Sequence, residues 1–407
     1  MKRTIKLAVA AAIALSSTAA FATNGDHLIG MGAKARGMGG IGIGMAHGAE
    51  SALSNPALIT SVEGTEVSFG GTVFMPNVKT DMGVGFSDSA ADLSVIPEVA
   101  IAQKASDNFY WGVGMFGVAG MGTDYRSSTG RTSNMNMVTN LQLMQFAVPL
   151  AYKTNGFALG IAPVLQYGSL DMNYNAAAFG GSDSQTQGVA QDFGFGYNIG
   201  TAYEVANLTV GASYKSAIDM NYKGQLSKAT GQFNTMFSAF GGFPVLADNL
   251  EQPAEIGVGT SYKLNGNTFA LDYKQIKWAD AKGYKDFGWE NQNVIILGYQ
   301  FAQDNWALRA GYNHSKNPIK EQNGATPQGA LLNTLNLLGF PAIVESHYTV
   351  GASYGLSKMT SLDLAYVYAP ETTATYSTQA FTGMGGAAQI STKHSQQATS
   401  VQLNFKF

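Results

Sequence analysis

A two-residue alternation of apolar and polar side chains, repeated along most of the chain, is the feature that most constrains its fold. Successive side chains of a β-strand point to opposite faces, so each such run predicts a strand with one apolar and one polar face. Runs of about 9 to 11 residues suit strands that cross a bilayer between a lipid face and a lumen face. The chain ends on a clear example, with apolar positions at Val401, Leu403, Phe405 and Phe407.

Runs of this kind can be placed at fourteen positions between residues 66 and 407. An even number of antiparallel strands is usual in single-chain bacterial barrels. The predicted fold class is therefore all-β, a 14-stranded antiparallel transmembrane β-barrel. The predicted strands are 66–75, 95–104, 110–116, 142–152, 157–166, 195–203, 208–215, 255–263, 268–274, 294–301, 306–313, 348–356, 362–368 and 401–407.

The connections between these runs alternate in length, which favours a barrel over a soluble sandwich. Short periplasmic turns and long external loops are typical of outer-membrane barrels. Tyrosines near the tight turns suit an interfacial belt (Tyr152, Tyr203, Tyr262, Tyr299 and Tyr354). Tight links are expected at 153–156, 205–207 and 265–267, and long loops at 76–94, 123–140, 171–192, 216–253, 314–346 and 369–397.

Residues 1–22 have the pattern of a signal peptide. Three cations (Lys2, Arg3 and Lys6) precede a short apolar core, and Ala20-Phe21-Ala22 offers small residues for cleavage before Thr23. The chain has no cysteine, and its 24 Lys and Arg against 27 Asp and Glu argue against nucleic-acid binding. We expect an exported protein of the bacterial cell outer membrane without disulfides or thiolate metal sites.

The segment from Gly25 to Ala57 follows neither a helical nor a strand period and is rich in glycine. Eight strands already fill a barrel with side chains, so fourteen enclose a wider lumen. We therefore predict that residues 23–64 form an N-terminal hatch inside a barrel of residues 65–407.

The mature start TNGDHLIGMGAKARGMGG, the Ser54-Asn55-Pro56-Ala57 sequence and the following barrel pattern resemble the outer-membrane transporters of long-chain fatty acids and toluene (FadL type). The resemblance covers essentially the whole mature chain. It implies external capture of a hydrophobic small molecule and passive release through the barrel wall into outer-membrane lipids. The hatch and N-terminal residues it implicates are Thr23, Asn24, Asp26, His27, Leu28, Asn55, Pro56 and Ala57.

Two amphipathic helices are expected in the long external loops, at helical spacing of apolar residues. They would form the walls of a capture groove, although they could equally pack on each other as a lid. Their apolar residues are Phe233, Met236, Phe237 and Phe240 in one loop and Leu331, Leu332, Leu335 and Leu338 in the other.

A glycine-rich run, Gly117 to Gly122, follows the predicted strand 110–116. Dense glycine favours a bulge or bend, and the resemblance implies that the third strand kinks there to open the wall. Gly117, Gly120 and Gly122 are therefore the candidate lateral opening. The alternative is an ordinary flexible exit into the next loop.

Three lumen cations, Lys215, Lys274 and Arg309, are candidate partners for a carboxylate ligand. Lumen charges more often pair with each other or with a plug, so this role stays open. Asp26 near the ligand pocket would favour a neutral hydrocarbon over a carboxylate.

Other functional classes fit less well. The five histidines lie in no catalytic motif, and no cluster has metal-ligand spacing, so we expect neither an enzyme nor a cofactor. A plugged general porin for small polar solutes is the main alternative, followed by an adhesin or purely structural barrel. Lipid-facing strands on all sides favour a monomer.

Overall fold

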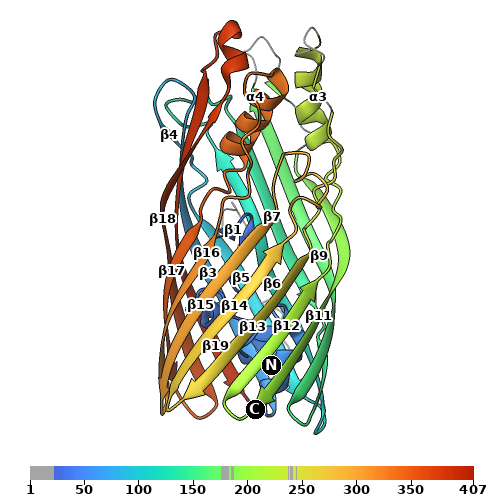
Figure 1. Ribbon diagram of the computed structural model, residues 1–407, viewed down its shortest axis with the longest axis vertical. Coiled ribbons are helices and arrows are strands. Elements are labelled where there is room, and N and C mark those ends of the chain that lie inside the picture. The colour runs from blue at the N-terminus through green and yellow to red at the C-terminus, as the bar shows by residue number, and fades with distance from the viewer. Residues whose placement is uncertain (1–22, 176–182, 185–187, 237, 239–241, 244) are drawn as a thin grey trace.

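The computed structural model describes residues 23–175, 183–184, 188–236, 238, 242–243 and 245–407. In this part of the chain, fourteen antiparallel strands close into one tall barrel (Figure 1). Closure comes from the last strand pairing with the first, from Ser391 opposite Asp81 to Lys406 opposite Glu66. None of the helices in the described ranges is long and apolar enough to cross a membrane.

The wall strands follow each other around the barrel in chain order. Their bounds are β3 (Thr65–Asp81), β5 (Ser94–Lys104), β6 (Phe109–Asp124), β7 (Val138–Ala147) continued by β8 (Leu150–Thr154), β9 (Phe157–Asn175), β11 (Ala190–Val205), β12 (Leu208–Lys215), β13 (Glu255–Leu264), β14 (Asn267–Ile276), β15 (Gln292–Gln303), β16 (Trp306–Ser315), β17 (Ser346–Gly355), β18 (Thr360–Ser377) and β19 (Gln389–Lys406).

The remaining elements are short. They are β1 (Thr23–Asn24), β2 (His27–Leu28), β4 (Ser87–Asp88) and β10 (Asp183–Ser184), the α-helices α2 (Gly32–Arg36), α3 (Leu226–Met236) and α4 (Pro327–Thr334), the 3-10 helices η1 (Gly48–Ala52), η2 (Pro56–Ser61) and η6 (Gln379–Met384), and the π-helix η5 (Leu335–Gly339).

The alternation predicted from the sequence holds through most of the wall. In β15, Ile295, Leu297 and Tyr299 are exposed on the outside, whereas Val294 and Ile296 are buried. The predicted tight links are confirmed, since Asn155 takes a φ of 48° and is followed by Gly156 at 79°, a two-residue turn that lets Thr154 pair with Phe157. These turns lie at one end of the barrel and α3 and α4 at the other (Figure 1).

Several predicted boundaries were wrong. The strands β3, β6 and β9 continue to residues 81, 124 and 175, beyond their predicted ends at 75, 116 and 166. The predicted strand 142–152 is broken between β7 and β8 at Val148-Pro149, because proline has no N–H to donate to the ladder. The predicted loop 369–397 is mostly strand, since β18 and β19 stay paired as far as Ser377 opposite Gln389. This outer extension is rich in Thr, Ser and Gln on both faces, so it carries no apolar alternation to reveal it.

Residues 23–62 lie within the barrel rather than outside it (Figure 1). Their short elements pack on strands from all around the wall, with α2 against β17, β18 and β19, and η2 against β8, β9 and β11. The apolar core of the molecule is formed where this segment and the outer loops meet the inner face of the strands.

Candidate functional site

The N-terminal end of the described chain forms a small hairpin inside the lumen. β1 pairs with β2, which sets Asn24 opposite His27. The Asn24 side-chain amide donates to Asn313 (2.8 Å) and Ser315 (3.0 Å) of β16, so the hairpin is held against the inner wall. All five predicted N-terminal site residues are buried: Thr23, Asn24, Asp26, His27 and Leu28.

The Asp26 carboxylate, at the tip of this hairpin, is held by two different loops. The Tyr284 hydroxyl of the β14–β15 loop donates to one of its oxygens, and Gln252 Nε2 of the β12–β13 loop lies 3.4 Å from the other. Burial raises the pKa of Asp26, while the nearby His27 and these hydrogen bonds oppose the shift. The hairpin tip is therefore tied to the external loops by polar contacts in a dry environment.

His27 joins the hairpin to a buried charge cluster. Its Nδ1 lies 2.9 Å from the Glu255 carboxylate at the start of β13, and its ring lies 5.0 Å from that of Trp278, centroid to centroid. The same carboxylate is 3.4 Å from Lys215 Nζ and 2.9 Å from Lys274 Nζ. Two of the three predicted carboxylate partners are thus already paired with an internal acid.

The third predicted partner, Arg309, lies elsewhere, close to the tight turn before β16. Its guanidinium donates to Gln300 (2.8 Å) and to the Ser353 hydroxyl (2.6 Å), which in turn donates to Asp363. The structure therefore does not bring Arg309 together with Lys215 and Lys274.

The strand β6 contains the predicted irregularity at its glycine-rich run. The register against β7 shifts between Gly117 and Ala119, which is a β-bulge. From Met115 to Thr123 every residue is buried, so the alternation of lipid-facing and lumen-facing positions stops there. The prediction of a bulge in this run is confirmed.

The N-terminal hairpin sits directly on this bulge. His27 of β2 is bridged to Ala119, and the Gly120 N–H donates to the Asp26 carbonyl oxygen over 3.1 Å. A bulge leaves backbone groups of the bulged strand without partners in the ladder, and here β2 supplies one of them. The lumen side of the irregular wall is therefore closed by the first residues of the described chain.

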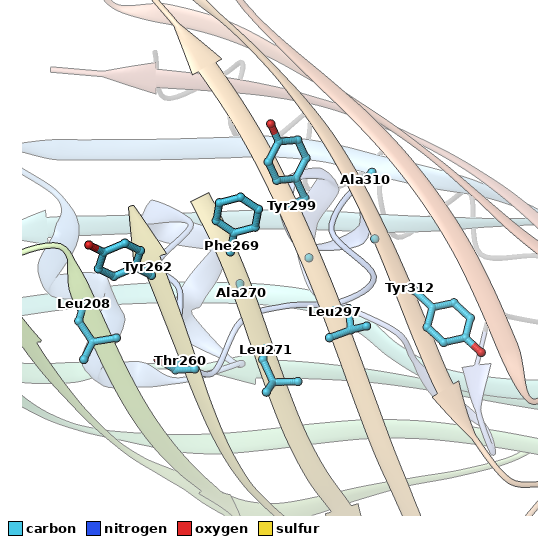
Figure 2. Close-up of a pocket in the computed structure, with 12 residues that line it drawn as sticks. Leu208, Thr260, Tyr262, Phe269, Ala270, Leu271, Leu297, Tyr299, Ala310 and Tyr312 are labelled. Carbon is cyan, nitrogen blue, oxygen red and sulfur yellow. The ribbon is translucent and has the colours of Figure 1, made fainter. Parts of the chain in front are cut away.

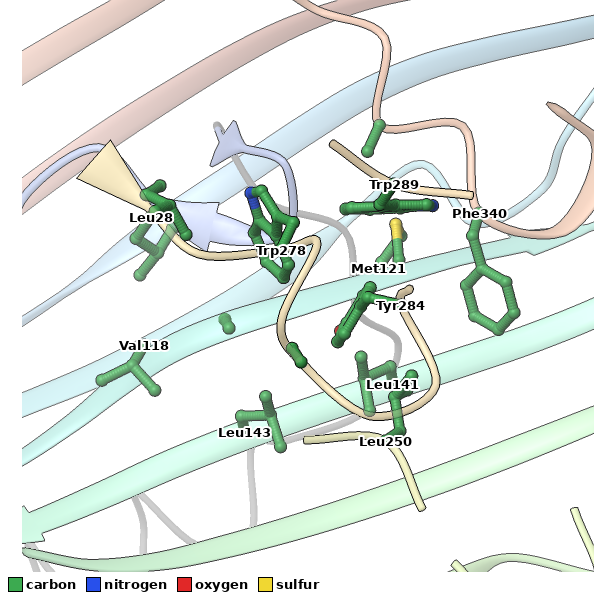
Figure 3. Close-up of a cluster of buried hydrophobic side chains, with 14 of the residues drawn as sticks. Leu28, Val118, Met121, Leu141, Leu143, Leu250, Trp278, Tyr284, Trp289 and Phe340 are labelled. Atoms are coloured by element: carbon green, nitrogen blue, oxygen red, sulfur yellow. The ribbon is translucent and has the colours of Figure 1, made fainter. Parts of the chain in front are cut away.

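An apolar cluster covers the hairpin on the side of the external loops (Figure 3). Trp278, Tyr284 and Trp289 contact one another pairwise, with ring centroids 4.6 to 5.0 Å apart. Met121 of β6 and Phe340 of the β16–β17 loop complete it, and only a small void of about 10 Å³ remains between them. The cluster joins the bulge, the hairpin and two external loops in one continuous apolar surface.

The predicted capture helices exist, but their described apolar residues face inward. Phe233 of α3 is buried and stacks on Tyr174 of β9 at 5.1 Å. Leu331 of α4 and Leu335 and Leu338 of η5 are also buried, while Leu332 is half-buried. Met236 ends α3, and Phe237 and Phe240 lie outside the described residues.

The π-helix η5 brings this second loop down onto the wall. The Thr123 and Thr392 hydroxyls donate to the carbonyl oxygens of Leu338 and Leu337, both at 2.8 Å. η5 is thereby fixed to β6 and β19. Gln328 of α4 donates to the Gly242 carbonyl oxygen beyond α3 at 3.2 Å, so the two helical loops touch.

The Asn55-Pro56-Ala57 sequence anchors the segment near the opposite end of the barrel. Asn55 caps η2 by accepting from the Ala57 N–H (3.1 Å), and its amide donates to Ile43 (2.9 Å) and to Thr201 of β11 (3.1 Å). Pro56 occupies the first turn of η2, where its missing N–H costs nothing. A Cβ at Gly200 would lie 1.9 Å from the Asn55 oxygen, so this glycine makes the contact possible.

Two charged contacts fix the rest of the segment to the wall. Asp272 of β14 accepts from three consecutive backbone N–H groups, of Gly42, Ile43 and Gly44, at 2.7 to 3.0 Å. Arg36 forms a two-pronged ion pair with Glu98 of β5. Buried charge-assisted contacts of this kind anchor residues 36–44 to β5 and β14.

A hollow of about 770 Å³ lies on the outside of the wall (Figure 2). It is lined by exposed side chains of β12 to β16, among them Tyr262, Phe269, Leu297 and Tyr299. These face away from the lumen segment, so the hollow is a contour of the lipid-facing surface. Within the described ranges, no group of three or more His, Asp or Glu is arranged to hold a metal ion.

Several residues that are central to these contacts were not identified from the sequence. Trp278, Tyr284 and Trp289 lie between the predicted strands 268–274 and 294–301, and Gln252 and Glu255 border another loop. Four large aromatic residues within twelve positions of one connection, Phe287 being the fourth, were the available signal. Their contacts with Asp26 and His27 bridge more than two hundred residues, which no local pattern reports.

The chain was compared with known families and curated proteins. A family model described as "Outer membrane protein transport protein (OMPP1/FadL/TodX)" matches residues 7–407. The 47 kDa outer membrane protein of Pasteurella multocida is 24% identical over 371 residues, covering 80% of this chain and 84% of that protein. An uncharacterized protein of Chlorobium limicola is 39% identical over 83 residues, 20% of this chain and 41% of that protein.

Solved structures share the fold at low identity. A Pseudomonas aeruginosa FadL homologue aligns with a TM-score of 0.70 at 16% identity, covering 94% of this chain and all of that one. The P. putida toluene transporter TodX aligns with a TM-score of 0.68 at 19% identity, over 93% and 99% of the two chains. The Ralstonia pickettii toluene transporter TbuX gives 0.63 at 16% identity, over 93% and 98%.

Proposed function

Because the chain belongs to the outer membrane protein transport protein family (OMPP1/FadL/TodX), we propose that it admits hydrophobic small molecules and releases them sideways through its wall at the β6 bulge. The observation that carries this proposal is the contact of the N-terminal hairpin with that bulge. His27 opposite Ala119 and the Gly120 N–H on Asp26 make the hairpin a removable part of the wall.

The bulge is the natural weak point of the wall. Apart from the break at Val148-Pro149 and a register shift near Ala369, neighbouring strands are joined by regular ladders. Such ladders are costly to open because each exposed backbone group loses a hydrogen bond in lipid. At Gly117 to Ala119 the ladder between β6 and β7 is already interrupted, and the missing contact is supplied by the hairpin. Withdrawal of residues 23–28 would therefore open a gap there without unpairing the rest of the barrel.

The exit direction suits an apolar ligand. A molecule that leaves through the wall passes from an apolar lumen surface into the bilayer, whereas exit into the periplasm exposes it to water. That exposure costs roughly 0.8 kcal/mol for each methylene group. Lateral release avoids this barrier, and the firmly anchored residues 32–62 block the alternative path along the barrel axis.

Entry is assigned to the lid formed by α3, α4 and η5. The expected capture residues Phe233, Leu331, Leu335 and Leu338 are apolar and buried in the closed state, so opening of the lid would expose them together. Below them lies the aromatic cluster of Trp278, Tyr284 and Trp289. A ligand that enters there comes directly against the residues that hold Asp26.

The internal charges favour an uncharged hydrocarbon as the ligand. Lys215 and Lys274 share the Glu255 carboxylate, and Asp26 adds a second carboxylate beside the bulge, so that two acids stand against two lysines. A fatty acid would need to displace one of these acids to gain a cation. An aromatic ligand needs only to replace ring contacts of the cluster, which are worth about 0.5–1.5 kcal/mol each.

The porin alternative is disfavoured by the same geometry. A general porin needs a continuous water-filled path, but residues 23–62 occupy the lumen and are almost entirely buried. The voids beside them are small, about 40 Å³ next to Ile43 and about 30 Å³ next to Val118. A polar solute would meet this segment before it met an open channel.

The test is a disulfide that locks the hairpin to the bulge. The chain has no cysteine of its own, so His27→Cys with Ala119→Cys introduces a single cross-link between bridged positions. In a host without its own transporter, uptake of radiolabelled toluene and of oleate is measured under oxidising and reducing conditions. We expect toluene uptake that stops on oxidation and returns on reduction, while each single-cysteine variant stays active.

Three results would contradict the proposal in different ways. Full toluene uptake by the oxidised protein would remove the hairpin gate. Oleate uptake without toluene uptake would overturn the uncharged ligand but leave the gate. Uptake of small sugars with neither hydrophobic ligand would identify a plugged porin.

A further inference from the structure

We propose that Gln396, His347 and Asn24 form a binding site for the chain's own free amino group at Thr23, which the predicted signal-peptide cleavage creates. The proposal rests on cleavage between Ala22 and Thr23, as expected from the sequence. It does not depend on which ligand the barrel carries.

Thr23 lies deep inside the lumen, with only 4% of its surface exposed. Its nitrogen donates to Gln396 Oε1 of β19 at 3.2 Å. Gln396 itself is 1% exposed. A nitrogen at this position is shielded from solvent, and every proton that it carries needs an acceptor from the protein.

The hydrogen-bond chain behind Gln396 fixes the orientation of each partner. His394 Nδ1 lies 2.8 Å from the Pro341 carbonyl oxygen, which only accepts, so Nδ1 carries the proton. His394 Nε2 is then an acceptor for Gln396 Nε2 at 3.2 Å. The Gln396 oxygen is thereby directed to the other side, where it receives Thr23 and His347 Nε2 at 3.1 Å.

This assignment leaves two buried acceptors unpaired, one on Asn24, the residue after Thr23, and one on His347, which shares the Gln396 oxygen with Thr23. Because His347 donates through Nε2, its Nδ1 is a lone-pair acceptor, and this atom is buried without a hydrogen-bond partner in the described part of the chain. The Asn24 oxygen is in the same condition, since its amide nitrogen donates to Asn313 and Ser315. Buried acceptors left unpaired are costly, about 1–3 kcal/mol each.

A free amino group matches this set, whereas a peptide nitrogen does not. The amide N–H of an uncleaved chain has one proton, which Gln396 already takes. A terminal amine carries two or three protons, which suits the oxygen of Gln396 together with Asn24 Oδ1 and His347 Nδ1. Removal of the signal peptide would therefore complete the hydrogen bonds that hold the hairpin in the lumen.

The consequence concerns the closed state. Thr23 pairs with Leu28 across the hairpin, and the next residues, Asp26 and His27, cover the β6 bulge. Seating of the amine thus fixes the element proposed above as the gate. A chain that keeps residues before Thr23 would lack these bonds.

The experiment measures how accessible the terminal amine is. Protein purified from outer membranes is sequenced from its N-terminus to confirm that it begins at Thr23. Its α-amine is then labelled with a succinimidyl ester in two samples, one folded in detergent and one unfolded in urea. We expect labelling of the folded protein to be slower by about tenfold or more. Gln396→Leu should bring the folded rate close to the unfolded one.

The neighbouring residue provides a matched control. Gln397 lies on the exposed outer face of the same strand, where it accepts from Tyr366, so Gln397→Leu should leave the α-amine protected. Folding of each variant is judged by its heat-dependent gel mobility. If Gln396→Leu does not fold, His347→Gln replaces it as the test variant. A mature chain that begins elsewhere, or equal labelling of folded and unfolded wild type, would overturn the proposal, as would equal protection in the two glutamine variants.

Discussion

The Tyr284 hydroxyl donates a hydrogen bond to the Asp26 carboxylate, which ties an external loop to the N-terminal hairpin across 258 positions of the chain. This bond links the two parts of the molecule that transport must coordinate. Tyr284 belongs to the aromatic cluster under the lid, and Asp26 lies against the β6 bulge. In the proposed mechanism, a ligand that disturbs the cluster would act on the hairpin through Tyr284 and through Trp278, which lies against His27.

Removal of this hydroxyl should loosen the hairpin. Tyr284→Phe leaves the buried Asp26 carboxylate with fewer partners, at a cost of about 1–3 kcal/mol. We expect a single cysteine at Leu28 to react with a maleimide roughly 5 to 100 times faster in this background. Tyr366→Phe, which loses a hydroxyl on the outer wall, is the control. Equal reactivity in the two backgrounds would show that the bond does not hold the hairpin.

A side chain at Gly117 should block the wall opening. The Cβ of a substituted residue would lie 2.5 Å from Ile96 Cγ2 of β5, so Gly117→Val forces these groups together at the bulge. Overpacking of this kind costs about 1–3 kcal/mol. We expect a folded barrel with greatly reduced hydrocarbon uptake, and recovery when Ile96→Ala provides space. Failure of the double variant to recover would place the defect elsewhere than this contact.

The stability of residues 32–62 in the lumen should depend on Asp272. Asp272→Ala leaves the N–H groups of Gly42, Ile43 and Gly44 without their acceptor, which destabilises the seated segment by several kcal/mol at about 1–3 kcal/mol per orphaned group. Entry of a polar dye that intact cells exclude should increase, and the heat-dependent mobility shift should occur at a lower temperature. Asp272→Asn keeps an acceptor oxygen and should retain most of the seal. If dye entry were unchanged in Asp272→Ala, the other contacts of the lumen segment would be sufficient to hold it in place.

The aromatic cluster should report ligand binding directly. Trp278 and Trp289 contact Tyr284 at 4.6 and 4.8 Å, so insertion of toluene changes the surroundings of both indoles. We expect a toluene-dependent change in tryptophan emission that is weakened about 2- to 10-fold in apparent affinity by Trp289→Leu. Trp306→Phe alters a ring packed on Phe301 near a periplasmic turn and should leave the titration unchanged. A signal lost only with Trp306 would place the ligand outside the cluster.

Local patterns were sufficient for the wall. Alternation over one strand depends on residues two apart, so the runs that form β13 to β17 could be located from the sequence with small boundary errors. The same applies to the two-residue turn at Asn155-Gly156 and to the bulge in the glycine run of β6. The prediction missed the break between β7 and β8 and the outer ends of β6, β9, β18 and β19. In β18 and β19 the outer extension is polar on both faces and gives no periodic signal.

The candidate site was only partly within reach of the sequence. Its N-terminal members were implicated by a family resemblance. The carboxylate role of the cations was left open, and the more common arrangement, pairing with an internal acid, is seen for Lys215 and Lys274. Lys215 and Lys274 share Glu255, an acid that neither spacing nor composition linked to them. The capture residues were expected in helices of the external loops, but the burial of Phe233 against Tyr174 depends on how its loop folds back onto the wall.

The sequence by itself therefore determined an all-β membrane barrel, its approximate strands, its short turns and a segment too irregular for the wall. The tertiary structure alone decided that Asp26 meets Tyr284, that His27 covers Ala119, and that Gln396 receives Thr23. The reason is physical. A strand reports its two environments through neighbouring side chains, whereas closing a barrel brings together residues hundreds of positions apart whose contacts leave no periodic trace.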